Sequence, residues 1–254
     1  MMKNKARILL YHSIGADGNG EVGSQLYSVS IEDFKQQMAY ISKRSNSRGG
    51  FLSSVAVTFD DGGITDFTNV YPVLKEFGIR AYFFIIASKV GTRGYMNWQQ
   101  IKELKNYGMI IGSHGLSHRN IAGLSDEELN QELMESKKIL EESLNERVDY
   151  FAVPFGFYNK KVIEKAKEAG YKRVFTSKFT DNDGFKHGRI AVKKNWDFNY
   201  FVKVINSGLS VTDRSRELIK HASRKILGVG NYNRIRKAIL KEQKRNKLLE
   251  AIGK

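Results

Sequence analysis

Short runs of apolar residues recur along the chain between residues 6 and 192, and most are rich in β-branched and aromatic side chains. Runs of roughly four to eight such residues, bounded by turn residues, are typical of buried strands. They predict strands over residues 6–11, 55–59, 81–87, 109–112, 149–153, 173–176 and 189–192.

Between these strands, apolar residues recur three or four positions apart, as they do on one face of a helix. Residues 30–42 illustrate the pattern, with Ile31, Phe34 and Met38 on one face and Ser30 in the capping position. Further helices are predicted over residues 70–77, 97–106, 125–144 (behind a capping box of Ser125 and Glu128) and 160–169. Strand and helix therefore alternate, which favours a parallel α/β fold.

Composition and charge divide the chain into two predicted parts. The chain has 254 residues, of which 41% are hydrophobic, so residues 1–210 can form one domain around a single core. The net charge is +15, but residues 214–254 hold 13 Lys and Arg against 3 Glu, which is a charge of +10. We therefore expect residues 211–254 to form a separate, basic, helical C-terminal tail.

Apolar residues of this tail recur at helical spacing among the lysines and arginines, as Leu218, Ala222 and Ile226 show. A basic amphipathic helix of this kind can lie on an anionic membrane surface. The alternative is an ordinary pair of C-terminal helices that pack on the domain and expose a basic face to solvent. Nucleic-acid binding ranks below membrane association, because no recognised nucleic-acid motif accompanies the charge.

The sequence excludes some classes of site and places the protein in an expected compartment. No cysteine is present, so disulfides and thiolate metal sites are excluded. The apolar run near the N-terminus, Ile8 to Leu10, is too short for a signal peptide, and no stretch is long enough for a membrane span. We expect a soluble cytoplasmic protein, peripheral to the membrane if the tail binds lipid.

Chemistry-bearing residues follow two of the predicted strands. Asp60 and Asp61 end the run 55–59, and His114 and His118 follow the run 109–112. Each motif alone is weak, but the carboxyl ends of parallel strands meet at one edge of a barrel, where active sites form. Two histidines and one carboxylate can hold a catalytic metal with an open position for water, which leaves the second carboxylate to act as a base.

At this point the sequence resembles a known family. The segments 58–62 (TFDDG), 113–118 (SHGLSH) and 151–156 (FAVPFG) are similar to three motifs of the polysaccharide deacetylases, also called carbohydrate esterase family 4 or the NodB homology domain. The resemblance extends over residues 6–208 and includes the Tyr11-His12 pair near the start. It implies a distorted parallel (β/α) barrel of about seven strands and a hydrolase that removes N-acetyl groups.

The resemblance also implies a role for each motif residue. Asp61, His114 and His118 would bind one divalent metal, Asp60 would be the general base, and the main-chain N–H of Phe155 would help to hold the oxyanion. Two imidazoles and a carboxylate suit Zn²⁺, while Co²⁺, Ni²⁺ and Fe²⁺ are alternatives. The expected substrate is an N-acetylated glycan, either a polysaccharide that contains N-acetylhexosamine or a glycan precursor.

The chain departs from the family pattern in two places. Ala152 stands where many members carry an arginine that holds the catalytic aspartate. Arg189, before the last strand, is a candidate replacement or else a surface arginine. The late histidine that serves as general acid is also missing, since His187 and His221 lie in polar surroundings and are expected to be solvent-exposed. His12 is the better candidate for the acid, or else a structural histidine.

Aromatic residues near the strand ends offer candidate sugar contacts. Trp98, Phe157 and Tyr158 could stack on sugar rings, although aromatic residues in such places more often belong to the core. Two alternatives to a deacetylase remain. The missing arginine and histidine would suit a pseudoenzyme that binds metal and carbohydrate without turnover, and the same fold could hydrolyse a different amide.

Overall fold

The computed structural model describes residues 7–15, 27–46 and 55–219, together with residues 222, 223, 226, 234 and 238. The chain divides into two compact units, Met1–Gly208 and Leu209–Lys254. The first unit carries every residue of the family motifs and is described first.

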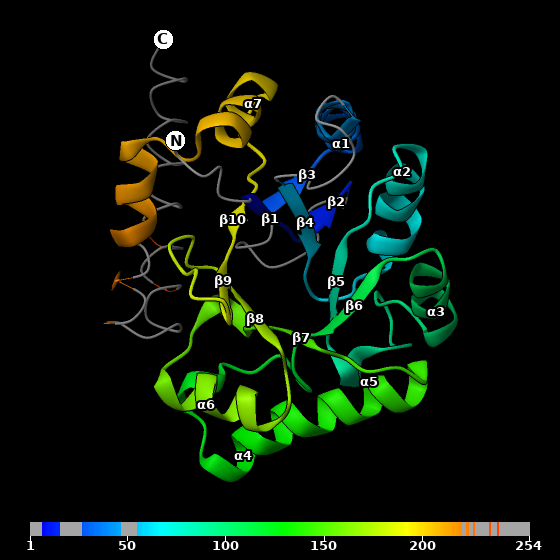
Figure 1. Cartoon of the computed structure of the whole chain (residues 1–254), viewed down its shortest axis with the longest axis vertical. Helices are drawn as coiled ribbons and strands as arrows, with labels where there is room; N and C mark the ends of the chain where they lie inside the picture. The colour runs from blue at the N-terminus through cyan, green and yellow to red at the C-terminus, as the bar shows by residue number, and fades with distance from the viewer. Residues whose placement is uncertain are drawn as a thin grey trace. The chain divides into compact units, whose positions relative to one another are not determined.

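A parallel sheet of eight strands forms the centre of the first unit (Figure 1). In spatial order the strands are β10 (Ile190–Ala191), β1 (Arg7–Tyr11), β4 (Val55–Phe59), β5 (Tyr82–Ile85), β6 (Ile110–Ser113), β7 (Tyr150–Ala152), β8 (Arg173–Thr176) and β9 (Lys186–Gly188). All neighbouring pairs are parallel. The predicted distorted barrel is confirmed, and each of the seven predicted strands is present. β9 is the additional strand.

The two edge strands of the sheet are neighbours in sequence. β9 and β10 lie at opposite ends of the spatial order, yet only Arg189 separates them in the chain. The chain therefore crosses from one edge of the sheet to the other within one residue, and the eight strands form a near-barrel. Arg189 lies at this seam between β9 and β10.

Helices surround the sheet in the order expected for alternating elements (Figure 1). They are α1 (Ile31–Asn46), α2 (Tyr71–Glu76), α3 (Trp98–Asn106), α4 (Asp126–Asn130), α5 (Ser136–Leu144), α6 (Lys160–Glu168) and α7 (Phe198–Ser207). The predicted helix over 125–144 is one helical run in which a π-turn, Gln131–Glu135, joins α4 to α5. A second π-turn, Asp66–Val70, precedes α2. A small parallel pair, β2 (Ser13–Ile14) and β3 (Ser28–Val29), completes the unit.

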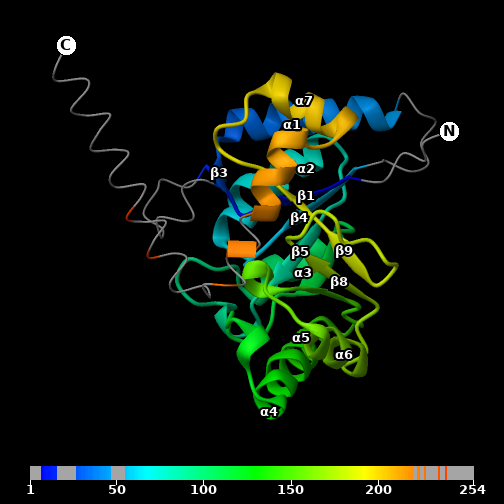
Figure 2. The same cartoon turned by 90° about the vertical axis from the view of Figure 1, so that its left-hand side faces the viewer.

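Local sequence signals account for the helix starts. Ser30 accepts a hydrogen bond from the Asp33 N–H at 3.0 Å, as the capping pattern predicts. The predicted capping box is also present, because Ser125 and Glu128 each accept a hydrogen bond from the other's N–H. α7 is additional to the predicted helices. It lies beside α1, where Tyr40 donates a hydrogen bond to Asn206 at 3.2 Å (Figure 2).

The two faces of the sheet carry separate aromatic clusters, because successive side chains of a strand point to opposite faces. On the face toward α1, Tyr11, Phe59 and Phe83 stack with ring centroids 5.5 and 4.9 Å apart. On the other face, Phe84 and Phe175 pack 5.0 Å apart. These buried rings set the positions of the strand ends from which the site is built.

In the second unit, residues 211–219 are helical. Val211, Leu218, Ile219 and Ile226 are exposed. Most of the predicted basic tail, and His221 with it, lies outside the described residues. Among the residues that are described, no helix is both long enough and apolar enough to cross a membrane.

Candidate functional site

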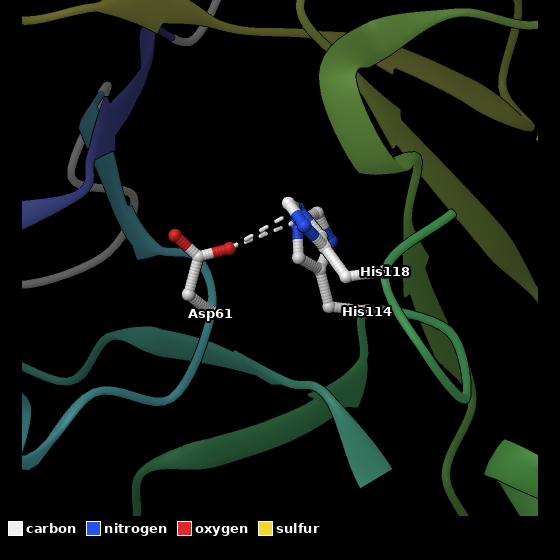
Figure 3. Close-up of side chains that lie close together, drawn as sticks. All are labelled: Asp61, His114 and His118. Atoms are coloured by element: carbon white, nitrogen blue, oxygen red, sulfur yellow. Dashed lines mark ion pairs between the residues drawn. The ribbon is translucent and has the colours of Figure 1, made fainter. Parts of the chain in front are cut away.

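Three of the predicted site residues meet at one edge of the sheet, as Figure 3 shows. Asp61 follows β4, His114 follows β6, and His118 lies four residues further along the same loop. One carboxylate oxygen of Asp61, Oδ1, lies 3.5 Å from Nε2 of His114 and 3.3 Å from Nε2 of His118. The three side chains thus direct two nitrogen atoms and one oxygen atom toward a common point.

The donor set and its spacing fit a divalent metal. Ligands held about 2.0–2.2 Å from a tetrahedral ion are roughly 3.3–3.6 Å from one another, and the two measured separations lie in that range. The Nδ1 atom of His114 is hydrogen-bonded to the carbonyl of Ala152 at 2.8 Å, which leaves Nε2 as the nitrogen that faces Asp61. Burial and the nearby His114 lower the pKa of His118, so this imidazole is neutral and can act as a ligand at neutral pH.

The backbone around these residues adopts an uncommon conformation. Asp61 (φ 79°), His118 (φ 60°) and Phe155 (φ 56°) all lie in the left-handed region, and Asn145 is the one other non-glycine residue to do so in the described part of the chain. Such conformations cost on the order of 1–3 kcal/mol each and are found at functional sites. Here they turn two ligands and the motif-three loop toward the same point.

Asp60 lies beside this cluster but has a different environment. Its carboxylate is 3% exposed and accepts two hydrogen bonds from the guanidinium of Arg189, at 2.6 and 2.8 Å. Burial alone would raise the pKa of Asp60, but the charges of Arg189 and His114 and the Arg189 hydrogen bonds outweigh it and lower the pKa to about 2. Asp60 is therefore ionised at neutral pH, with Oδ2 3.8 Å from Nε2 of His114.

Arg189 reaches Asp60 from the seam between β9 and β10. Its side chain is 2% exposed and crosses the inside of the near-barrel, with its guanidinium carbon 5.4 Å from the ring of Phe84. It also donates to the hydroxyl of Thr58 at 3.2 Å. The interpretation of Arg189 as a surface residue is thus wrong. An arginine contacts the aspartate although Ala152 occupies the position where the family pattern has one.

His12 is half-buried at the end of β1. Burial lowers its pKa, and the nearby carboxylates of Asp61 and Asp60 act in the opposite direction. Its Nδ1 atom is buried and has no hydrogen-bond partner among the described residues, and its ring lies 5.1 Å from that of Tyr27. A titratable imidazole therefore lies within the electrostatic field of the cluster, as the prediction for His12 requires.

His187, expected to be solvent-exposed, is half-buried, with its ring 5.7 Å from that of Phe175 and its Nε2 3.2 Å from the carbonyl of Gly184. That expectation was wrong because the polar residues around His187 form β9, which pairs with β8.

The sugar-stacking roles of three aromatic residues stay predictions. Trp98, Phe157 and Tyr158 are all half-buried. The hydroxyl of Tyr158 donates to Asp181, and burial together with this bond raises the pKa of Tyr158. The exposed fraction of Phe155 is 41%, and its ring packs 4.4 Å from that of His118, so this aromatic side chain contacts one of the candidate ligands.

Three residues near the site were missed by the sequence analysis. Asp66 is 1% exposed, and neither carboxylate oxygen has a hydrogen-bond partner within the described ranges; burial and the charges of Asp61 and Asp60 raise its pKa. Burial and Asp61 also raise the pKa of Tyr95. Glu132 is buried beneath the histidine loop. Only Glu132 carried a signal, because it is a charged residue on the apolar side of its helix.

Comparison with known proteins agrees with this geometry. A sequence model of the polysaccharide deacetylase family matches residues 52–174. The peptidoglycan-N-acetylglucosamine deacetylase of Bacillus cereus is 36% identical over 124 residues, which are 48% of this chain and 56% of that protein. The poly-β-1,6-N-acetyl-D-glucosamine N-deacetylase of Staphylococcus aureus is 28% identical over 177 residues, 59% of this chain and 61% of that protein. The chain thus spans less than two thirds of the length of these relatives.

Solved structures show the same fold. The deacetylase PplD of Streptococcus pyogenes, in complex with acetate, has a TM-score of 0.69 at 24% identity, and the match covers 79% of this chain and 98% of that one. IcaB from Ammonifex degensii has a TM-score of 0.66 at 24% identity, with coverage of 80% and 97%. The resemblance to the polysaccharide deacetylase family that the three motifs predicted is confirmed.

Proposed function

We propose that the protein is a metal-dependent N-deacetylase that acts on a polysaccharide or glycan precursor containing N-acetylhexosamine. The observation that carries the proposal is the pairing of a buried, ionised Asp60 with a three-ligand cluster, Asp61, His114 and His118. A base and a metal site at one strand edge are the elements that hydrolysis of an amide needs.

Each residue then has a task in the reaction. A bound metal would polarise the acetamide carbonyl and lower the pKa of a bound water molecule. Asp60 would accept a proton from the attacking water as the water oxygen bonds to the carbonyl carbon, and the main-chain N–H of Phe155 would donate a hydrogen bond to the developing oxyanion. His12, which its lowered pKa leaves neutral at neutral pH, receives this proton from Asp60 and passes it to the sugar nitrogen as the C–N bond breaks, so that the products are acetate and a free amine. Arg189 holds Asp60 in its ionised form.

Zn²⁺ is the proposed metal, since two imidazole nitrogens and a carboxylate oxygen form a typical zinc ligand set. Co²⁺ or Ni²⁺ would accept the same donors. The names of the relatives support an N-acetylglucosamine polymer as the substrate class, because one is a peptidoglycan deacetylase and another a poly-N-acetylglucosamine deacetylase.

Acetate release from N-acetylglucosamine oligosaccharides by the metal-loaded protein, with and without chelator, tests the proposal. We expect chelator-sensitive release that is lost in His118→Ala; unchanged activity in that variant would overturn the assignment. A protein that binds metal and sugar but never releases acetate would be a pseudoenzyme. Product identification would reveal a hydrolase of a different amide.

We also propose that the basic tail brings the enzyme to an anionic membrane surface from the cytoplasmic side. Support comes from the charge of +10 over residues 214–254 and from the exposed apolar side chains Val211, Ile219 and Ile226. Binding to phosphatidylserine vesicles that is lost on removal of residues 214–254 is the expected result. Equal binding to neutral vesicles would contradict it, and binding to nucleic acid instead would favour the alternative partner.

A further inference from the structure

The two histidine ligands are held by different means. His114 is 2% exposed and its Nδ1 atom is hydrogen-bonded to a main-chain carbonyl. The side chain of His118 is 27% exposed, and no hydrogen bond to its ring is present in the described part of the chain. Its ring contacts are with His114, 5.0 Å away, and with Phe155. The position of His118 therefore depends on the loop that carries it.

One buried carboxylate holds that loop. Oε2 of Glu132 accepts hydrogen bonds from the N–H groups of Leu116, at 2.8 Å, and Ser117, at 3.0 Å. Its other oxygen, Oε1, accepts from the hydroxyl of Ser117. All three donors come from the two residues immediately before His118. Glu132 itself is 3% exposed.

The other side of the loop is held by the backbone of residues 87–88. The N–H groups of Ala87 and Ser88 donate to the carbonyls of Gly115 and Leu116, at 3.1 and 3.0 Å. Gly115 has φ 82°, and a Cβ atom placed there would lie 3.1 Å from Oε2 of Glu132. The loop between the two histidines thus lies between the Ala87–Ser88 backbone and the Glu132 carboxylate, in close contact with that carboxylate at Gly115.

The cost of burying the Glu132 carboxylate argues that this side chain holds the histidine loop. No cation pairs with Glu132 among the residues that the structure describes, and burial of a carboxylate is costly unless hydrogen bonds offset it. Charge-assisted hydrogen bonds from three donors offset that cost, and all three donors belong to the histidine loop. Glu132 also lies in the π-turn that interrupts the helical run, and π-turns frequently occur at functional sites.

We propose that Glu132 is a positioning residue that sets the affinity of the site for its metal by holding His118 in place. The inference rests on the proposed metal site. Glu132 does not touch the ligand atoms; it acts through the backbone of Leu116 and Ser117. Loss of Glu132 would leave the loop free to move, so His118 would have to be ordered when the metal binds.

The test is a competition titration with a chelating indicator, using Zn²⁺ and Co²⁺, together with thermal unfolding of the metal-free protein. Glu132→Ala is expected to weaken metal binding by about 10–100-fold, as loss of an outer-sphere partner commonly does. Glu132→Gln should recover most of the affinity, because an amide can accept both N–H bonds and donate to the Ser117 hydroxyl. Glu135→Ala, at an exposed position of the same turn, is the matched control and should bind metal as the wild type does.

A second comparison separates positioning from general destabilisation. In a His118→Ala background, Glu132→Ala should no longer change metal affinity, because the two residues act through one another. An equal loss of affinity in both backgrounds would overturn the proposal. So would a variant whose metal-free unfolding temperature falls while its metal affinity stays at the wild-type value.

Two further results are informative. If Glu132→Ala does not fold, Ser117→Ala, which removes one donor and no charge, should weaken binding by a smaller factor; unchanged binding there would overturn the proposal. If the wild type binds neither metal, the metal site itself is wrong. If the wild type binds metal and all Glu132 variants match it, the metal site stands and only the role of Glu132 is wrong.

Discussion

The two sides of the site are built in opposite ways. On the base side, Asp60 is buried inside the near-barrel and bound by Arg189 through two hydrogen bonds of 2.6 and 2.8 Å. On the ligand side, where the metal is proposed to bind, Asp61 and His118 are partly exposed, both have positive φ, and they stand on loops. Adjacent carboxylates in one Asp-Asp pair thus have separate environments, because the backbone turns sharply between them.

This difference in burial separates the residues that contribute to folding stability from those that contribute to the affinity for the metal. A buried ion pair is coupled to folding, since the removal of one partner leaves the other charge uncompensated. Ligands on partly exposed loops contribute little to the core and can be adjusted without unfolding the protein. We expect substitutions on the base side to change stability and rate, and substitutions on the ligand side to change metal affinity.

The largest expected effect comes from isosteric changes of the two carboxylates. Asp60→Asn should keep the metal but lower kcat by about 10²–10⁴-fold, the usual contribution of a general base. Asp61→Asn should lose the metal while the metal-free protein unfolds near the wild-type temperature. Bound metal and acetate release measured on both variants decide this. Metal loss in Asp60→Asn with retention in Asp61→Asn would reverse the two roles.

Removal of the arginine tests the base side directly. Arg189→Met should destabilise the protein by about 3–5 kcal/mol, because a buried carboxylate is left unpaired. The free energy of unfolding in denaturant measures it, with the exposed Arg93→Met as control. The double variant with Asp60→Asn should lose less than the sum of the single variants. Additive losses would show that Arg189 and Asp60 do not stabilise one another.

The pH dependence of stability sharpens the same point. The pKa of Asp60 is about 2 in the folded protein, below the value of about 3.9 for an unfolded aspartate. Its stabilising contribution is therefore complete above pH ~4 and is lost as the pH falls toward 2, an amount of about 2–3 kcal/mol. Chelator-treated wild type should lose this stability relative to Asp60→Asn. Parallel pH profiles would contradict the depressed pKa.

Asp66 provides the contrasting case, a buried carboxyl without an arginine. Because its pKa is raised in the fold, the protein is penalised as the pH rises above about 4. Asp66→Leu should therefore stabilise the metal-free protein by about 1–3 kcal/mol at pH 7, with a smaller gain near pH 4. Unfolding of this variant and of Asp66→Asn, which keeps a polar group, measures the effect. A loss of stability at pH 7 would indicate that Asp66 has a partner in solution.

Much of the arrangement was predictable because periodicity and strand ends are local properties. Runs such as 55–59 and 109–112 are strands, and the residues that follow them meet at one edge because the strands are parallel. β9 was not predictable in this way, since Lys186–Gly188 has no apolar period and becomes a strand only through pairing with β8. His187 was misjudged for the same reason. The roles assigned to Phe155 and His12 stay predictions.

By itself, the sequence determined the alternation of strands and helices, the resemblance to the family, and the proposal of Asp61, His114 and His118 as metal ligands, because each depends on short local motifs. Only the tertiary structure decided which arginine holds Asp60 and which carboxylate holds the histidine loop. Arg189 lies 129 residues from Asp60, and Glu132 lies 15 residues from Ser117. Closure of the sheet at the β9–β10 seam brings Arg189 to Asp60, and packing of the helical run under the loop brings Glu132 to Ser117. Both contacts matter because a buried charge is stable only where it is paired or hydrogen-bonded.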